Sequence, residues 1–202
     1  IIEETSVMGV QQKDDHFECE DLSDSEDRRL DYDVSLTPAG KAAFQPPRET
    51  LLRFEGTDYE SVIEDDPFVL FGVHPYDMVA INQMDEIFSM DNCDVHYMAR
   101  REAATIVACD VQNASDDVFA GYMGTETVDE GFDVLLTKIE DGYLVDVRTE
   151  KGESLAEPLQ NAPEATEEDL AAREKVWEEN KQELRQHELR AMPEDWPDLL
   201  RE

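Results

Sequence analysis

The sequence predicts a mixed α/β fold: one compact domain with a β-hairpin, followed by a long C-terminal helical extension. Two apolar runs of strand length flank a helical stretch, and this order predicts parallel strands joined by a crossover. Asp141-Gly142 separates two β-rich segments, which is a strong hairpin signal. Beyond Gly152 the composition becomes more polar, so we assign residues 1–158 to the domain and residues 159–202 to the extension.

The first segments predict a small hairpin and an irregular connection. Ser6–Val10 and His16–Glu20 have the character of two short strands around a polar turn. Residues 21–29 are acidic and typical of a turn. The stretch 36–49 contains three prolines, so it is not expected to be regular throughout.

The central segments predict a strand, a helix and further strands. Phe68–Val73 is a continuous apolar run, as expected for a strand that is buried on both faces. Asp77–Met90 carries apolar residues at helical spacing, and Ala104–Cys109 is a second apolar strand. Phe132–Ile139 and Tyr143–Val147 flank the Asp-Gly turn. The predicted sheet therefore contains both parallel and antiparallel pairs.

A long polar helix is expected in the extension. Thr166 and Asp169 resemble a capping box in which Asp replaces Glu, and the helix should run to about Arg190. Its narrow apolar stripe repeats every seven residues, which favours a helix that lies over the domain or reaches a partner subunit. The stripe consists of Leu170, Trp177, Leu184 and Ala191. A further short element is expected at residues 196–200.

Length and composition indicate a globular protein. The chain has 202 residues, of which 40% are hydrophobic, enough for one domain with a core. No apolar run is long enough to cross a membrane. The chain starts at Ile1 without a signal-peptide pattern, so we interpret it as part of a longer polypeptide. Its three widely spaced cysteines form no disulfide framework, which favours the reducing cytoplasm.

The charge is strongly acidic. There are 51 acidic and 17 basic residues, for a net charge of −34. Such a charge repels DNA, RNA and anionic lipid, so nucleic acid and membrane are not expected partners. The carboxylates are spread along the chain, as in a protein from a halophilic host, where concentrated salt screens the repulsion. A protein whose charge is diluted within a larger complex explains the same composition.

One acidic segment has the composition of a metal site. His16, Glu18 and Glu20 would share one face of a strand. A solvated edge strand protected by charge is the favoured interpretation in so acidic a chain. Cys93 and His96 have a two-ligand spacing, but no second pair completes a four-coordinate site.

Other chemical motifs are weak. His74-Pro75-Tyr76-Asp77 joins a buried strand to a helix amino terminus, a position that attracts anions. A plain strand exit with Asp77 as the helix cap explains the segment without any function, and this interpretation is favoured. Cys109 lies in an apolar run, where cysteine usually acts as a small hydrophobic residue. The sequence has no glycine-rich phosphate loop.

A series of segments, taken in order, resembles one family of electron-transfer subunits. The segments are Leu30–Asp33, Pro46–Phe54, Leu70–Asp77, Tyr97–Ala103, Met123–Thr125 and Gly131–Asp133. Together they resemble the amino-terminal domain of the sulfhydrogenase beta and anaerobic sulfite reductase A subunits, over residues 5–155. Residues 166–202 resemble the helical lead-in to that family's ferredoxin-like domain. That domain carries two 4Fe–4S clusters in the family and is absent from this sequence.

The departures from the family concern sulfur. The resemblance implies cysteines at four positions where this chain has Tyr76, Val111, Val118 and Ala120. Four thiolates are what a 4Fe–4S cluster requires. We therefore hypothesise that the domain has lost a cluster, that the four positions lie close together, and that no cofactor is bound by this chain. Clusters would then reside in partner subunits or in a missing C-terminal domain.

Three functions remain open from the sequence. The leading hypothesis is a non-catalytic adaptor or accessory subunit of an iron–sulfur oxidoreductase complex. Its partners would be iron–sulfur, flavin or hydrogenase-type subunits. The alternative is an electron-transfer subunit whose two-cluster domain lies beyond Glu202. A stand-alone divalent-metal enzyme that uses His16, Glu18 and Glu20 is the least favoured.

Overall fold

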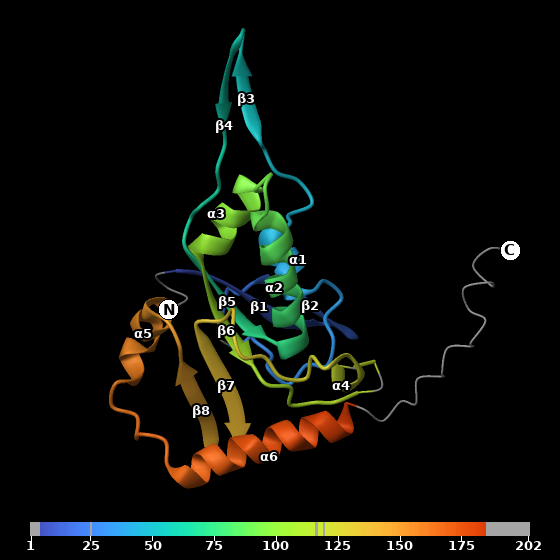
Figure 1. Cartoon of the computed structure of the whole chain (residues 1–202), viewed down its shortest axis with the longest axis vertical. Coiled ribbons are helices and arrows are strands. Elements are labelled where there is room, and N and C mark those ends of the chain that lie inside the picture. Colours follow the sequence, from blue (N-terminus) through green and yellow to red (C-terminus); the bar gives the residue numbers. More distant parts are fainter. Residues whose placement is uncertain (1–4, 25, 116, 119, 185–202) are drawn as a thin grey trace, which may run out of the picture.

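The computed structural model describes residues 5–24, 26–115, 117–118 and 120–184 (Figure 1). Its elements, in chain order, are β1 (Ser6–Lys13), β2 (His16–Asp21), α1 (Ala39–Phe44), β3 (Leu52–Glu55), β4 (Asp58–Ser61), β5 (Phe68–Val73), α2 (Pro75–Ser89), α3 (Val95–Ala103), β6 (Ala104–Cys109), α4 (Ala120–Met123), β7 (Val134–Ile139), β8 (Gly142–Val147), α5 (Glu150–Ala156), a 3-10 turn η1 (Glu157–Leu159) and α6 (Glu167–Glu183).

One mixed sheet organises the described part of the chain. Its six strands follow the order β2-β1-β5-β6-β7-β8. The four inner strands are parallel neighbours, and the two edge strands pair antiparallel through the β1–β2 and β7–β8 hairpins. The predicted mixed α/β fold is confirmed, including the parallel pair β5–β6 and the hairpin at Asp141-Gly142.

Apolar side chains cover both faces of the sheet. On one face, α1, α2 and α3 pack over the sheet, and Ile81 of α2 is fully buried together with Leu70 and Ile106 of the sheet. On the other face, a smaller cluster around Val69 and Val107 is covered in part by α5. Burial on both sides explains the continuous apolar runs of β5 and β6, because neither face meets water.

The start of α2 differs from the prediction. The helix begins at Pro75, whose missing N–H and fixed φ suit the first helical position, and His74 is the N-cap. Asp77 is therefore inside the first turn, and its interpretation as the helix cap is wrong. Its carboxyl accepts a hydrogen bond from the backbone N–H of Ala39. Asp77 thus links the amino-terminal ends of α2 and α1.

The short helices α1, α3, α4 and α5 were not predicted from the sequence. α3 is capped by Asp94, whose carboxyl accepts from the backbone N–H groups of His96 and Tyr97. The Cys93–His96 spacing belongs to this cap, and Cys93 is exposed. α1 is six residues long and lies within the proline-bearing stretch. Packing of Phe44 in the core, and not helix propensity, sustains so short a helix.

The helix α6 lies against β7 and β8 (Figure 1). The predicted capping box between Thr166 and Asp169 is present in both directions. Leu184 is fully buried, whereas Leu170 is 42% exposed, so only part of the predicted stripe contacts the domain. The helix ends at Glu183 with Leu184 as its C-cap, so the predicted end near Arg190 is wrong. Ala191 and the element expected at residues 196–200 lie outside the described residues.

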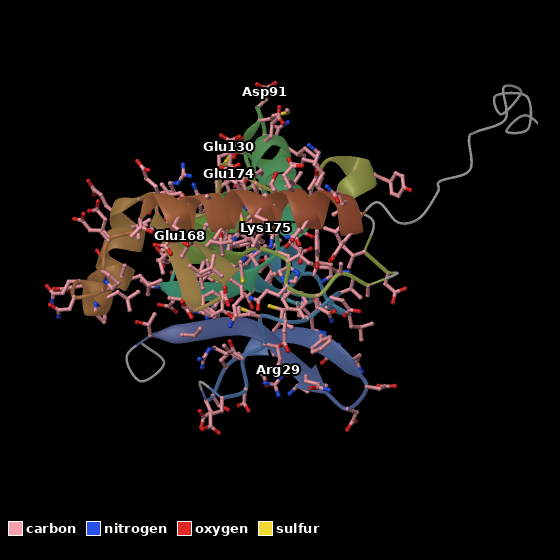
Figure 2. The ribbon with its side chains drawn as sticks, turned by 90° about the horizontal axis from the view of Figure 1, so that it is seen from below. Arg29, Asp91, Glu130, Glu168, Glu174 and Lys175 are labelled. Carbon is pink, nitrogen blue, oxygen red and sulfur yellow. The ribbon has the colours of Figure 1, made fainter. Side chains whose placement is uncertain are left out.

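The opposite side of α6 faces water. Figure 2 shows the helix along one side of the molecule and β1 and β2 on the other, with Glu168, Glu174 and Lys175 on the helix. Charged side chains cover the surface in this view, in keeping with the net charge of −34. Among the described helices, none has the length and apolar character needed to cross a membrane.

Candidate functional site

The structure brings the four sequence-predicted positions together in one apolar cluster. Val111, Val118 and Ala120 are each at most 5% exposed and form it with Leu184 from the end of α6. Tyr76 packs against them as a partly buried residue. Three segments of the chain, around Tyr76, around Val111 to Ala120 and at Leu184, therefore share one small volume.

Three connections place these residues at the same edge of the sheet. Tyr76 follows β5 in the first turn of α2, and Val111 follows β6 by two residues. β5 and β6 are parallel, so their carboxyl ends meet at one edge, the usual location of sites in α/β proteins. Ala120 begins α4 at the end of the same loop.

A bulge in β5 directs the chain into this edge. The strand register shifts between Phe71 and Val73, at Gly72, whose φ of 83° is unfavourable for other residues. The Gly72 carbonyl accepts a hydrogen bond from the Tyr32 hydroxyl at 3.0 Å. Tyr32 also stacks on the His74 ring, with centroids 3.8 Å apart. The bulge and the stacked pair fix the exit from β5.

His74 lies at the centre of a buried polar network. Its Nδ1 is 2.7 Å from the Tyr76 hydroxyl, which donates to the Asp33 carbonyl. Burial lowers the pKa of His74 to about 4, although the nearby Leu30 carbonyl opposes the shift, so the imidazole is neutral at pH 7. Its Nε2 has no hydrogen-bond partner of regular geometry among the described residues. The hydroxyl of Tyr76 is thus occupied by the protein itself.

Asp77 adds a buried carboxyl beside this network. Burial raises its pKa to about 6, while the hydrogen bond from Ala39 acts in the opposite direction. Burial also raises the pKa of the Tyr76 hydroxyl, with a further contribution from the Asp77 charge. Burial at this edge of the sheet therefore disfavours the ionised forms of Asp77 and Tyr76, because they lack water there.

A second polar network holds α6 against the site. The Asp110 carboxyl accepts from Thr137 Oγ1 at 2.6 Å and from Trp177 Nε1 at 2.9 Å. Asn180 Nδ2 donates to the Val111 carbonyl at 3.0 Å. Burial raises the pKa of Asp110, and the two side-chain hydrogen bonds oppose the rise. These contacts place Leu184 over the apolar cluster and close it on one side.

Sequence reasoning did not identify Asp110 as a structural anchor. A signal was present, because a polar residue directly after a buried strand lies at the carboxyl edge of the sheet. Its partner Trp177 belonged to the predicted stripe, but only as an apolar residue. The indole N–H of a buried tryptophan requires an acceptor, and here Asp110 supplies it.

The side chains of the four positions do not fit an iron–sulfur cluster. A 4Fe–4S cluster is held by four thiolates, whereas Tyr, Val, Val and Ala supply none. Cys109, two residues before Val111, is fully buried, and burial raises its thiol pKa to about 12. Its sulfur accepts a hydrogen bond from Gln112 Nε2 at 3.2 Å. A single protonated thiol does not replace a four-thiolate ligand set.

The three candidate metal ligands of the acidic strand β2 pair with different residues. These ligands are His16, Glu18 and Glu20. His16 Nε2 is 3.3 Å from a Glu18 oxygen, and its Nδ1 is 3.2 Å from Asp15. Glu20 instead pairs with Lys13 of β1 at 2.9 Å. Among the described residues, no group of three or more His, Cys, Asp or Glu side chains is arranged to hold a metal ion.

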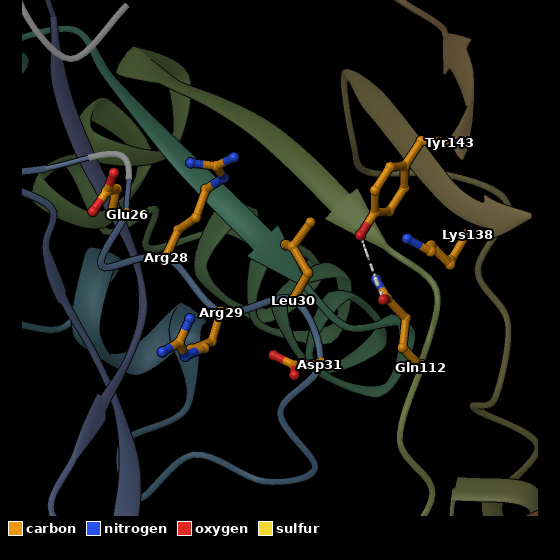
Figure 3. Close-up of a pocket in the computed structure, with 8 residues that line it drawn as sticks. All are labelled: Glu26, Arg28, Arg29, Leu30, Asp31, Gln112, Lys138 and Tyr143. Atoms are coloured by element: carbon orange, nitrogen blue, oxygen red, sulfur yellow. Dashed lines mark hydrogen bonds between the residues drawn. The ribbon is translucent and has the colours of Figure 1, made fainter. Parts of the chain in front are cut away.

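A cavity of about 540 Å³ lies beside the site (Figure 3). It is lined by side chains from residues 26–31, by Gln112, and by Lys138 and Tyr143 of the β7–β8 hairpin. The Gln112 amide donates to the Tyr143 hydroxyl at 3.3 Å. Three cationic and two carboxylate side chains line the cavity, so their charges largely balance and favour no strongly charged ligand.

The chain that forms this mixed sheet and its closed carboxyl edge resembles the sulfhydrogenase beta subunits in its sequence. The relative that carries this resemblance is Sulfhydrogenase 2 subunit beta from Pyrococcus furiosus, with 30% identity over 165 residues. The match covers 81% of this chain and 49% of the relative, so the chain spans about half the length of the curated protein it matches.

Two further comparisons gave no match. No protein-family model matches the chain, and no solved structure is significantly similar to it. The part of the sequence resemblance that concerns anaerobic sulfite reductase stays a prediction.

Proposed function

We propose that this chain is an accessory, non-catalytic subunit of a multi-subunit iron–sulfur oxidoreductase of the hydrogenase type, and that its described domain holds no cluster. The observation that carries the proposal is the apolar cluster of Val111, Val118, Ala120 and Leu184 with Tyr76. It occupies the positions where the family resemblance implies thiolates. The similarity to a protein named as a sulfhydrogenase subunit supports the class of complex.

The chemistry of the cluster supports a structural role. Its buried side chains are aliphatic, and the Tyr76 hydroxyl is committed to the Asp33 carbonyl. Leu184 is held in place through Trp177 and Asn180 of α6. In this proposal, apolar packing fixes α6 on the sheet where the family resemblance implies a cluster. Electrons would then pass through neighbouring iron–sulfur, flavin or hydrogenase-type subunits.

Purification of the native complex under anaerobic conditions tests the proposal. We expect the chain to be present at a fixed ratio to iron-containing subunits, and iron and acid-labile sulfide to be assigned to those subunits. Two clusters on the native polypeptide that contains this chain would favour an electron carrier instead. Catalytic activity of the isolated monomer would contradict the accessory role.

The remaining alternative, a divalent-metal enzyme, has its own test. Such an enzyme would show saturable stabilisation by a divalent cation that is lost in His16→Ala. We expect the divalent cation to change the unfolding temperature of wild type and of His16→Ala by the same amount. The reason is that Glu20 is paired with Lys13 and is not free to complete a metal site.

A further inference from the structure

A two-stranded arm projects from the domain. β3 and β4 form a separate antiparallel sheet, and Figure 1 shows it extending beyond α3 at the end of the molecule away from α6. All eight strand residues are exposed. With a rise of about 3.4 Å per residue, each four-residue strand extends about 14 Å. The arm is long enough to enter a groove on another protein.

The two faces of the arm differ in chemistry. Phe54 pairs directly with Tyr59, and Leu52 lies two residues before Phe54 on the same face. Phe54 and Tyr59 are each 74% exposed. The opposite face carries the pairs Arg53–Glu60 and Glu55–Asp58. One face is therefore apolar and aromatic, and the other is charged.

The root of the arm is fixed to the domain. Arg100 of α3, only 8% exposed, donates to Glu49 before β3 at 2.6 Å and lies 3.9 Å from Glu64 after β4. The same guanidinium donates twice to the Phe44 carbonyl at the end of α1. One buried cation thus holds both chain segments of the arm. The arm is a positioned element and not an irregular loop.

The aromatic pair of Phe54 and Tyr59 leaves a large apolar surface in contact with water, because each side chain is 74% exposed. Two-stranded hairpins are marginally stable alone, and exposed apolar patches on a soluble protein mark interaction sites. We propose that the apolar face of this arm docks in a groove of a different subunit of the oxidoreductase complex. The inference rests on the proposed function, because it names the surface through which that subunit binds.

The charge of the arm and of the whole chain indicates which kind of partner binds this surface. Residues 48–66, which contain the arm and its root, include seven carboxylates and two arginines, and the whole chain carries −34. A second copy of the chain would bring like charges together, and an anionic lipid surface would be repelled. The fitting partner is a protein groove with an apolar floor for Phe54 and Tyr59 and a basic rim for the acidic flank.

Paired variants of the full chain, expressed in its native host, test the docking surface. In F54S/Y59S the apolar face is removed, and R53S/E60S is the matched control on the opposite face. We expect at least a tenfold loss of co-purifying complex subunits for F54S/Y59S, because buried aromatic residues dominate binding. The control should retain binding within about threefold. Neither variant should change the unfolding temperature of the free chain, since the strand residues are exposed.

Photo-cross-linking keeps the test independent of folding. A photoreactive phenylalanine analogue at position 54 should cross-link to another subunit of the complex, and the same analogue at position 60 should not. Cross-links to a second copy of this chain would overturn the assignment. Equal losses in both double variants, or no loss in either, would also overturn it. If the wild-type chain associates with no iron–sulfur subunit, the proposed function itself fails.

Discussion

Asp77→Asn probes the desolvated carboxyl beside the candidate site. Burial raises the folded-state pKa of Asp77 from 3.8 to about 6. The folded state then binds more protons than the unfolded state between pH 4 and pH 6, so the carboxyl lowers stability progressively as pH rises through this window. The difference between a pKa of 3.8 and a pKa of about 6 corresponds to about 3 kcal/mol of stability, which is lost above pH 6 and retained below pH 4.

Asp77→Asn should remove the loss of stability that ionisation of the buried Asp77 carboxyl causes. Asparagine is uncharged and keeps an oxygen that accepts from the Ala39 N–H. We expect the free energy of unfolding of the variant, relative to wild type, to rise by about 2 kcal/mol between pH 4.5 and pH 7.5. Urea denaturation at a series of pH values, followed by circular dichroism, measures this difference and cancels the charge effects common to both chains.

An exposed carboxyl provides the control. Asp91 follows the end of α2 and is exposed, so Asp91→Asn has no buried carboxyl to neutralise. A constant difference between Asp77→Asn and wild type across the pH range would refute the reasoning, because it would mean that Asp77 ionises as easily in the folded chain as in the unfolded one.

Three further perturbations test the surrounding structure. Trp177→Phe should cost about 1–3 kcal/mol in urea denaturation, because the buried Asp110 loses a donor; unchanged stability would mean that α6 is held elsewhere. Gly72→Ala should cost about 1 kcal/mol more than Gly56→Ala in the same assay, because both have positive φ but only the added Cβ at position 72 meets a neighbour, the Leu30 side chain at 2.7 Å, which must shift. Raising KCl from about 0.1 M to about 1 M should raise the unfolding temperature, since screening weakens repulsion within a chain of net charge −34; a fall would contradict this.

The sequence predicted the sheet well because its strands are buried on two faces. The apolar runs of β5 and β6 and the Asp-Gly turn between β7 and β8 are local signals that the tertiary structure reinforces. The capping box of α6 is equally local. The helix α1 was missed because its stability comes from Phe44 in the core, which no local pattern reports.

The arm and the helix cap show the limits of local reasoning. Leu52 to Ser61 alternate around Gly56 in a pattern that signals a hairpin, yet the absence of a packing partner for either face is visible only in three dimensions. Asp77 has the chemistry of an N-cap, but Pro75 fixes the start of the helix and turns the carboxyl towards α1.

The four positions of the candidate site were predicted to lie close together only because of the family resemblance, and no local pattern in the sequence indicates it. Their proximity depends on the parallel register of β5 and β6 and on the return of α6 to the sheet. Leu184 was predicted as a stripe residue, with no indication that it would complete the same cluster. The His74 network also required the structure, because Tyr32 and Asp33 reach it across 40 or more residues.

Iron analysis of the 202-residue chain after anaerobic reconstitution tests most directly whether the edge formed by Tyr76, Val111, Val118 and Ala120 binds iron. We predict no stoichiometric iron or acid-labile sulfide on the wild-type chain, and about four of each on Y76C/V111C/V118C/A120C, because the four positions share one volume. About four irons on the wild-type chain would contradict the account.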